Sequence, residues 1–560
     1  MSAIENDDHT LVTKMNRRLS SLDTERLSWL WHWRTIAHYI QPRLGRFLET
    51  PNEGNRGSAK NKRIIDSTGT TASQRFGAGM FAGTCSPARP WFRIKIAGMD
   101  DSMDAEVKLW CDEVEKRMRA ILSQSNFYRT MATLFEELGV FGTCVALMYE
   151  DFEQTIRFYP KAAGEFYLGV DHRLEVTTYA EKIVMTVEQI VGKFGKENCS
   201  EQVRMFYANN DLDKEILIGH VICPNDQQVL GAHGVNGMSY LDVAWEWGRD
   251  QNALLQKKGF HEKPFIAARW NVNGNDAYGR SPGMDALGDV MQLQVTQKRK
   301  GQLLDKIVNP PMVAPITLKN QPATSIPGGV TYLAGTEGTA FFKPAYEVNP
   351  QAYPAVNEDI NVVQKRVQTV FFEDLFLMIA QLDTVRTAAE IYERKEEKML
   401  MLGPALERIH DEGLSIVIYR LFGMMARTGQ LPSTPEAIQG RALSIEFVSM
   451  LAQAQKAAAT SILERVWALA GNIAAVKPSV LDNLNEDVSI REYGDMLGAP
   501  TKMFVDPKAV MKMRDARAKQ QQAAQAAQMG AGAAQSAKVL SETEVGGGQS
   551  ALQKVLGLAA

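Results

Sequence analysis

The sequence predicts an α+β protein with a long helical section, and three observations carry this prediction. Residues 1–280 alternate amphipathic helices with short strands, and the strands concentrate between residues 155 and 270. Two long helices follow, at about residues 282–308 and 357–380, and a proline- and glycine-rich insertion separates them. The remaining chain is mainly helical and ends in a segment rich in alanine, glutamine and glycine.

The amino-terminal part predicts helices that flank a β region. The first helix ends at Pro42, because the proline ring and its missing N–H oppose continuation. The predicted helices lie at about residues 11–40, 63–84, 105–123, 127–141 and 186–194. The predicted strands lie at residues 91–96, 143–149, 156–159, 165–170, 175–185, 215–223, 242–247 and 265–270.

The first long helix begins with Ser281-Pro282, a good N-cap followed by a proline that has no N–H to leave unpaired. Each long helix would measure about 36–40 Å at ~1.5 Å per residue. Residues 296–302 form a polar middle that holds Lys298, Arg299 and Lys300. A helix with a polar middle either crosses solvent or lies beside copies of itself. These three cations would then face either a channel or the outside.

The second long helix carries apolar residues at steps of three and four between residues 357 and 380. The insertion before it, residues 310–354, contains too many prolines for a helix or a central strand. Short strands are possible there at residues 312–318, 329–334 and 339–343. Two helices of matched length around such an insertion suggest a rod-like pair with a small module at its far end.

The carboxy-terminal part predicts helices with one strand. After a short break at residues 381–387, the predicted helices lie at residues 388–401, 406–427, 452–475 and 506–529, and the strand lies at 443–448. Residues 481–500 form a short, polar segment. From Gly530 the chain is of low complexity and we expect it to be mobile.

Length, charge and cysteine usage limit the classes of protein to which the chain can belong. A chain of 560 residues should form two to four units, and 45% hydrophobic with 23% charged residues is typical of a soluble globular protein. The net charge of −3 argues against tight binding of nucleic acid through phosphate neutralisation. Five cysteines without a CxxC motif, a polar amino terminus and no run of ~18–20 apolar residues predict a soluble intracellular protein.

The pattern Gly279-Arg280-Ser281-Pro282-Gly283 matches the G-x-S-x-G elbow of serine hydrolases. That elbow needs a backbone N–H on the residue after the serine, and Pro282 has none. Ser281 is therefore interpreted as a helix cap, with a serine hydrolase as the rival hypothesis.

Other motifs are weaker. Gly77-x-Gly79 lies inside a helical stretch, which favours close backbone packing over dinucleotide binding. His220 and Cys223 form one H-x-x-C pair, whereas a structural zinc site needs four ligands. The aromatic segment Trp29–Arg34 favours helix packing over base stacking. No P-loop is present. We expect no catalytic, cofactor or metal site.

The order of these signals resembles the portal, or head-to-tail connector, proteins of short-tailed T7-like bacteriophages. No single motif is decisive, but their joint order is specific, and the resemblance covers roughly residues 15–515. The carrying residues are Trp33, Ile36, Tyr39 and Pro42; Ile65-Asp66-Ser67-Thr68; Ser86-Pro87-Ala88-Arg89-Pro90-Trp91-Phe92; Tyr278-Gly279-Arg280-Ser281-Pro282-Gly283; Asn309-Pro310-Pro311; Arg386-Thr387-Ala388-Ala389-Glu390; and Leu402-Gly403-Pro404.

The resemblance implies a portal fold with a mainly helical wing, a two-helix stem, a small β-containing clip and a helical crown. The implied parts are wing 1–281 and 388–450, stem helices 282–308 and 357–380, clip 309–356, tunnel loop 381–387, crown 451–525 and a mobile tail 526–560. The implied tunnel-loop residues beside DNA are Leu382, Asp383, Thr384, Val385 and Arg386. Lys298, Arg299 and Lys300 would be the channel-facing part of the stem.

The same resemblance implies a non-enzymatic ring, usually of twelve subunits, at one vertex of a virion that is assembled in the host cytoplasm. Genomic DNA would be packaged and ejected through the ring with only weak contact. Terminase, major capsid and scaffolding proteins and a tail adaptor would be its partners, without a membrane or a cofactor. A cytoplasmic helical adaptor or scaffold without a channel is the alternative, and ring formation with a central hole distinguishes the two.

Overall fold

The computed structural model describes most of the chain as two compact units, Met1–Ala458 and Ala459–Ala560. Among the described residues, no helix combines the length and apolar character needed to cross a bilayer. The described residues are 3–45, 59–96, 105–229, 231–248, 253–313, 343–344, 349, 351–380, 402–438, 441, 443–448, 463–474, 477, 483–497, 505 and 507–542.

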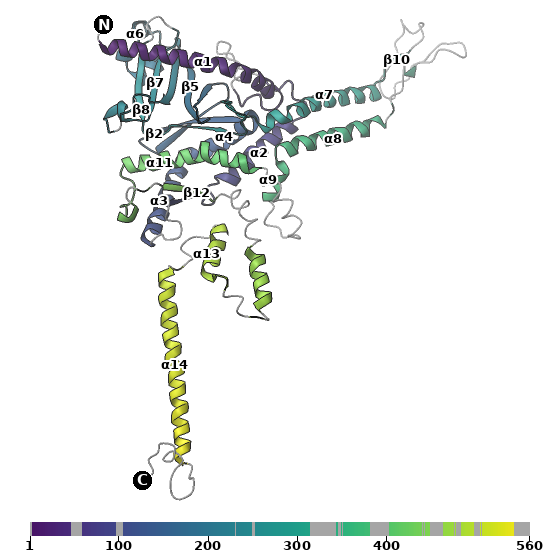
Figure 1. The fold of residues 1–560 in the computed structure, drawn as a ribbon. Helices are drawn as coiled ribbons and strands as arrows, with labels where there is room; N and C mark the ends of the chain where they lie inside the picture. Colours follow the sequence, from purple (N-terminus) through teal and green to yellow (C-terminus); the bar gives the residue numbers. More distant parts are fainter. Residues whose placement is uncertain are drawn as a thin grey trace, which may run out of the picture. The chain divides into compact units, whose positions relative to one another are not determined.

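Antiparallel sheets form the centre of the first unit and confirm the α+β prediction (Figure 1). A five-stranded sheet has the order β4-β5-β6-β7-β8, and a three-stranded sheet has the order β3-β2-β9. The strands are β2 Thr143–Asp151, β3 Thr155–Lys161, β4 Phe166–Val170, β5 Val176–Thr186, β6 Glu215–Pro224, β7 Tyr240–Glu246, β8 Leu254–Phe260 and β9 Phe265–Arg269.

Strand β8 was not predicted. Its sequence, LLQKKGF, has two lysines in the middle, and only Leu255 of the strand is fully buried. The alternation that marks a half-buried strand is therefore weak. Two short helices connect β5 to β6: α5 Val187–Phe194, as predicted, and α6 Glu201–Ala208, which was not predicted.

Helices cover these sheets. Helix α1 Ala3–Tyr39 begins earlier than predicted and packs on the five-stranded sheet, where Trp245 Nε1 donates to Asn16 Oδ1 at 2.8 Å. In the aromatic segment of α1, Trp33 is fully buried, and its ring lies edge-on to that of Tyr278 with ring centroids 5.1 Å apart, so this residue serves packing. Trp31 stays exposed, with the Arg34 guanidinium 5.3 Å above its ring.

The helix α2 Thr68–Thr84 crosses α4 Phe127–Phe141 closely, and Gly77 makes this possible. A Cβ atom on Gly77 would lie 3.0 Å from the backbone of Glu136, and one on Gly79 would overlap the ring of Phe376. This confirms that Gly77-x-Gly79 serves close packing.

A two-stranded ladder joins distant parts of the first unit. Strand β1 Phe92–Ile96, which follows the Pro-rich turn, pairs antiparallel with β12 Leu443–Phe447. Helix α3 Ala105–Gln124 packs against β1. The Trp91 ring is stacked with the rings of Phe127 and Phe447, at centroid-to-centroid distances of 5.8 and 6.4 Å.

The helix predicted at residues 406–427 is divided by a π turn. Residues 402–409 are α-helical, His410–Leu414 form the π turn, and α11 Ser415–Arg427 continues the helix. Apolar periodicity does not reveal a single inserted residue, which explains why the sequence did not predict it. In the turn, Glu412 accepts hydrogen bonds from the buried Arg269 guanidinium of β9, the shortest at 2.5 Å.

The two long helices leave the sheets together (Figure 1). Helix α7 Pro282–Val308 has the predicted bounds. The second predicted helix differs: α8 Ala352–Val370 starts earlier, and α9 Glu373–Ala380 follows a break at Phe371–Phe372, where Phe372 adopts a φ of 56°. Beyond the helices, β10 Met312–Val313 pairs with β11 Lys343–Pro344.

The second unit contains helical residues 463–474, α13 Glu486–Leu497 and α14 Pro507–Glu542. The short polar segment at residues 481–500, for which the sequence predicted no element, includes helix α13. Helix α14 continues beyond Met529, because its alanine- and glutamine-rich sequence has high helix propensity even without an apolar face. Arg514 of α14 donates two hydrogen bonds of 2.7 Å to Asp487 of α13.

Candidate functional site

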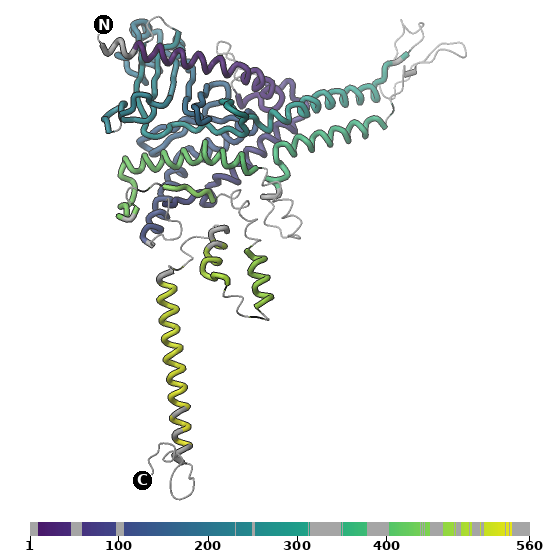
Figure 2. The backbone as a smooth tube through the Cα atoms, viewed as in Figure 1, coloured from purple at the N-terminus to yellow at the C-terminus, as the bar shows by residue number. Residues whose placement is uncertain are grey.

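The candidate site is the antiparallel pair of α7 and α8, hereafter the helix pair, together with the segment that anchors it. Figure 2 shows the two backbones side by side, and the helices are in contact. Ile360, Val363 and Val367 of α8 are buried, as are Val290 and Leu293 of α7. An apolar seam therefore holds the part of the pair nearest the sheets.

The pair begins at Ser281, whose side chain is completely buried. Its hydroxyl accepts a hydrogen bond from the Met284 N–H at 3.0 Å and donates to the Val140 carbonyl at 2.7 Å. The first bond caps α7, and the second ties the cap to the end of α4. Both hydrogen-bonding roles of the hydroxyl are used, so the structure confirms the helix-cap interpretation.

The corner between α4 and β2 receives the residues before this cap. Gly142 has a φ of 76°, and a Cβ there would overlap the Gly279 carbonyl, so only glycine fits this close approach. The Gly279 N–H donates to Thr143 Oγ1 at 2.8 Å, and the Trp270 N–H donates to the Gly142 carbonyl at 2.9 Å. The root of α7 is thus fixed to the sheet by backbone contacts.

Asp66 joins both helices of the pair to the loop before α2. Gln297 of α7 and Gln364 of α8 each donate a side-chain amide hydrogen to Asp66 Oδ2, at 2.9 and 2.8 Å. Gln294, also on α7, accepts from the N–H groups of Ile65 and Asp66 at 2.6 and 2.8 Å and donates to the Asp66 carbonyl at 3.0 Å. Asp66 therefore connects the loop before α2 with both α7 and α8.

The Asp66 carboxylate is stabilised in its charged form. Burial alone would raise its pKa, but hydrogen bonds from Thr68, Gln297 and Gln364 outweigh burial and hold the pKa below its ordinary value. The sequence showed Gln294 and Gln297 only as polar interruptions of the apolar stripe. Their partner is more than two hundred residues away in the chain, which a local pattern does not reveal.

The three predicted channel-facing cations take different positions. The Lys300 ammonium turns to α8, where it donates to Asn357 Oδ1 at 2.7 Å and lies 5.5 Å above the Tyr353 ring. Lys298 and Arg299 are exposed. The structure thus separates Lys300, which joins the pair, from two cations that remain available at the surface. Leu382, Asp383, Thr384, Val385 and Arg386 lie outside the described residues.

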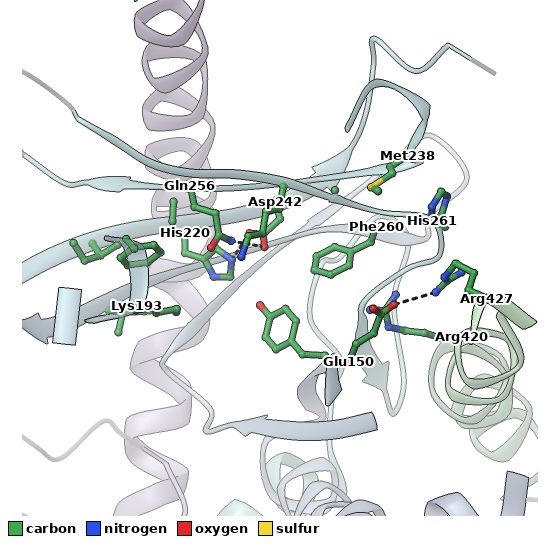
Figure 3. A pocket seen from close by; sticks show the side chains of 17 residues that line it. Glu150, Lys193, His220, Met238, Asp242, Gln256, Phe260, His261, Arg420 and Arg427 are labelled. Carbon is green, nitrogen blue, oxygen red and sulfur yellow. Dashed lines mark hydrogen bonds and ion pairs between the residues drawn. The ribbon is translucent and has the colours of Figure 1, made fainter. Parts of the chain in front are cut away.

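His220 lies between the carboxylates of Glu181 and Asp242 inside the five-stranded sheet, and Figure 3 shows it beside Asp242. Its Nδ1 is 2.9 Å from Glu181 Oε1, and its Nε2 is 2.7 Å from Asp242 Oδ1. Residues three apart in a strand point to opposite faces, which separates the His220 and Cys223 side chains. Among the described residues, no cluster of three His, Cys, Asp or Glu side chains could hold a metal ion.

The electrostatics of this cluster favour an imidazolium. Burial alone would lower the His220 pKa, but Asp242 and Glu181 outweigh burial and raise it to about 9. Burial would likewise raise the Glu181 pKa, but His220 and Lys161 lower it to about 2. The sequence carried a signal that was missed: Glu181, His220 and Asp242 interrupt three neighbouring apolar strands.

A cavity of about 580 Å³ lies beside this cluster (Figure 3). Several polar groups in its walls contact one another: the Gln256 side chain donates to Asp242 Oδ2 at 2.9 Å, and Arg427 forms ion pairs with Glu262 and Glu150. The Arg420 guanidinium, completely buried, lies 4.9 Å from the Phe260 ring centre. These contacts join α11 to the sheets.

The sequence matches the family model "Bacteriophage head to tail connecting protein" over residues 12–505. It is 41% identical over 533 residues to the portal protein of Salmonella phage epsilon15, covering 95% of each protein. It is 40% identical over 526 residues to a probable portal protein of Bordetella phage BPP-1, covering 93% of this chain and 94% of that protein.

Among solved structures, a chain in the neck of an empty gene transfer agent particle is 12% identical. That alignment covers 78% of this chain and 90% of the other, with a TM-score of 0.34, which does not establish a common fold.

Replacing Ser281 by alanine should lower the free energy of unfolding by about 2 kcal/mol, because the change removes a cap and leaves the buried Val140 carbonyl unpaired. Urea denaturation followed by circular dichroism measures this loss. Ser200→Ala is the matched control, since Ser200 caps α6 at 3.3 Å from a half-exposed position and should cost about 1 kcal/mol or less. Equal losses in both variants would contradict the anchoring role.

Replacing Asp66 by asparagine should destabilise the helix pair at neutral pH and flatten the acid dependence of stability. A carboxylate with a depressed folded pKa contributes stability above its unfolded pKa of about 3.9 and loses it as pH falls through the folded value. Denaturation midpoints between about pH 7 and pH 3 measure the difference. Asp211→Asn is the control, because Asp211 is exposed and forms a surface ion pair with Lys214. A wild-type acid slope in the Asp66 variant would contradict the assignment.

Replacing His220 by glutamine should lower stability near pH 6 by about 3 kcal/mol, since it removes the cation that lies between the two buried carboxylates. In the wild type, the contribution of a raised histidine pKa is complete below about pH 6.5 and is lost as pH rises through about 9. The variant should lack this alkaline decline. Denaturation at pH 6 and pH 9 tests it, with the exposed His233→Gln as the control. An unchanged decline in the His220 variant would refute the role of the imidazolium.

Proposed function

The chain belongs to the bacteriophage head to tail connecting protein family, and we infer that it is a portal protein. In this function it forms a ring at one vertex of the capsid, through which genomic DNA enters and leaves and to which the tail attaches. The identity of 41% across 95% of both chains to a phage portal protein carries this conclusion. The virion capsid is its place of action, and assembly of the ring takes place in the host cytoplasm.

The helix pair supports a ring of identical subunits. Its exposed outer surfaces include apolar side chains such as Met291, Val295 and Val362, which a single subunit leaves uncovered. Heterologous contacts close into a ring when the rotation between neighbours divides a full turn. We propose twelve subunits, with α7 and α8 as the stem and residues 309–356 as the clip.

The remaining parts follow the same proposal. The sheets and their covering helices, residues 1–281 and 388–450, form the wing, and residues 451–525 form the crown. Residues 381–387 form the tunnel loop, where Leu382, Asp383, Thr384, Val385 and Arg386 meet DNA. Terminase and later the tail adaptor dock on the clip, while major capsid and scaffolding proteins surround the wing.

Passage of DNA requires weak contact. A wall that neutralised many phosphates would hold the polymer, because each released counterion adds to the affinity. The net charge of −3 fits a conduit better than a tight binder. The protein itself performs no chemistry in this proposal. The hydroxyl of Ser281 is buried and makes two hydrogen bonds, which favours the portal function over a serine hydrolase.

The ring has a direct test. The purified full-length chain should form closed rings with a central hole in negative-stain images, and native mass spectrometry should give roughly 750 kDa for twelve copies of a 62.2 kDa chain. Scaffolding protein is added in a parallel sample, because assembly can depend on it. Monomers or dimers in both samples would refute the portal function, and compact oligomers without a hole would favour a helical adaptor. Ester hydrolysis that disappears in Ser281→Ala would favour the hydrolase.

A further inference from the structure

The outer face of α7 carries exposed apolar and basic residues. Met291 and Val295 are 38% and 49% exposed, one turn apart, and Lys298 and Arg299 follow in the next turn. At 100° per residue these four side chains lie on one side of α7, opposite to the buried Leu293 and the side that contacts α8. The α7 outer face is hereafter Met291, Val295, Lys298 and Arg299.

The outer face of α8 carries exposed apolar and acidic residues. Val362 is 54% exposed, and Glu358 and Asp359 are exposed one turn earlier. The buried Ile360 and Val363 lie toward the other side of α8. The α8 outer face is hereafter Val362, Glu358 and Asp359.

Contacts inside the pair fix the heights of these residues along the helices. Lys300 contacts Asn357 at 2.7 Å, and Asp289 forms an ion pair of 3.2 Å with Arg366. In this antiparallel register Val295 stands level with Val362. One turn farther from the sheets, the two cations of the α7 outer face stand level with the two acids of the α8 outer face.

We propose that the α7 outer face of one subunit packs on the α8 outer face of the next subunit in the ring. Val295 then meets Val362, while Lys298 and Arg299 meet Glu358 and Asp359. This interface rests on the proposed ring. In the proposed ring the helix pairs stand along the ring axis. Rotation about that axis leaves the height of every residue unchanged, so residues that are level within one pair are also level across the boundary between two pairs.

Charge complementarity identifies a second copy of this chain as the occupant. Within the part of the chain that the structure describes, the ion pair between α7 and α8 joins Asp289 to Arg366 and involves none of these four charged groups, which are all exposed. The two outer faces lie on opposite sides of the same pair, so they meet only between subunits. Lys365, the nearest cation on α8, stands level with the uncharged Met291, which avoids a like-charge contact.

The interface also accounts for the passage of DNA. Lys298 and Arg299 on a channel wall would form a ring of positive charge that retains phosphates. Paired with Glu358 and Asp359 between subunits, the same cations add no such ring to the wall. Two of the three predicted channel-facing cations, Lys298 and Arg299, are thereby assigned to the contact between neighbouring helix pairs, while Lys300 stays inside its own pair.

A disulfide between engineered cysteines tests the proximity. In rings of a Val295→Cys/Val362→Cys variant, mild oxidation should produce a ladder of covalent multimers on non-reducing gels, since β-carbons in contact satisfy disulfide geometry. Four of the five native cysteines are buried and Cys223 is half-buried, which keeps the background low. Each single-cysteine variant should give no ladder.

The matched control is Val295→Cys/Thr369→Cys. Thr369 is exposed on the same side of α8 but two turns closer to the sheets, about 10.5 Å away along the helix. A ladder of equal yield in the control, or none in the test variant, overturns the interface while rings remain visible. Absence of rings in the wild type is a different result, because it overturns the portal function itself.

Charge reversal tests the pairing. A Lys298→Glu/Arg299→Glu variant and a Glu358→Lys/Asp359→Lys variant should each need about tenfold more protein for half-maximal ring assembly, because two attractive pairs per interface become repulsive. An equimolar mixture of the two should assemble like the wild type, with the variants alternating around the ring. Thermal unfolding of each subunit should be unchanged. Assembly of the single variants at the wild-type concentration, or no rescue on mixing, overturns the pairing.

Discussion

The buried hydroxyl of Ser281 is the point on which the helix pair depends. A long helix that leaves its supporting sheet acts as a lever, and a small rotation at its first turn displaces its far end. The hydroxyl removes that freedom by bonding Met284 inside α7 and Val140 at the end of α4. Gly142 and Gly279 let the two backbones approach closely enough for these bonds to form. The direction of α7 is therefore fixed by backbone geometry.

Asp66 completes this anchor from the other side. A single attachment at the root would still allow the pair to pivot, whereas the contacts of Asp66 with Gln297 and Gln364 hold both helices farther along their length. These bonds are charge-assisted, and they remain so over the pH range in which the carboxylate is ionised. The sheets and the helix pair are thereby joined at two separated points, which restricts pivoting of the pair.

Local sequence signals predicted the helices and strands but not the contacts that connect them. The bounds of α7 followed from Ser281-Pro282 at its start and Asn309-Pro310-Pro311 after its end, because capping and proline effects act within a few residues. The break at Phe371–Phe372 and the π turn at His410–Leu414 depend on tertiary packing, so periodicity did not reveal them. The Asp66 joint and the Glu181–His220–Asp242 cluster link residues distant in sequence. Their polar members were visible, but their partners were not.

Buried and exposed charged groups have different roles in this chain. His220 and Asp66 have their partners inside the subunit, where removing one partner leaves a buried charge or donor at high cost. Lys298, Arg299, Glu358 and Asp359 have no such cost, because water solvates them in the free subunit. In a proposed ring of twelve, each exposed pair contributes about 0.2–1 kcal/mol, yet symmetry repeats it at every boundary. The sum can hold the ring closed while each boundary stays weak enough to adjust as DNA passes.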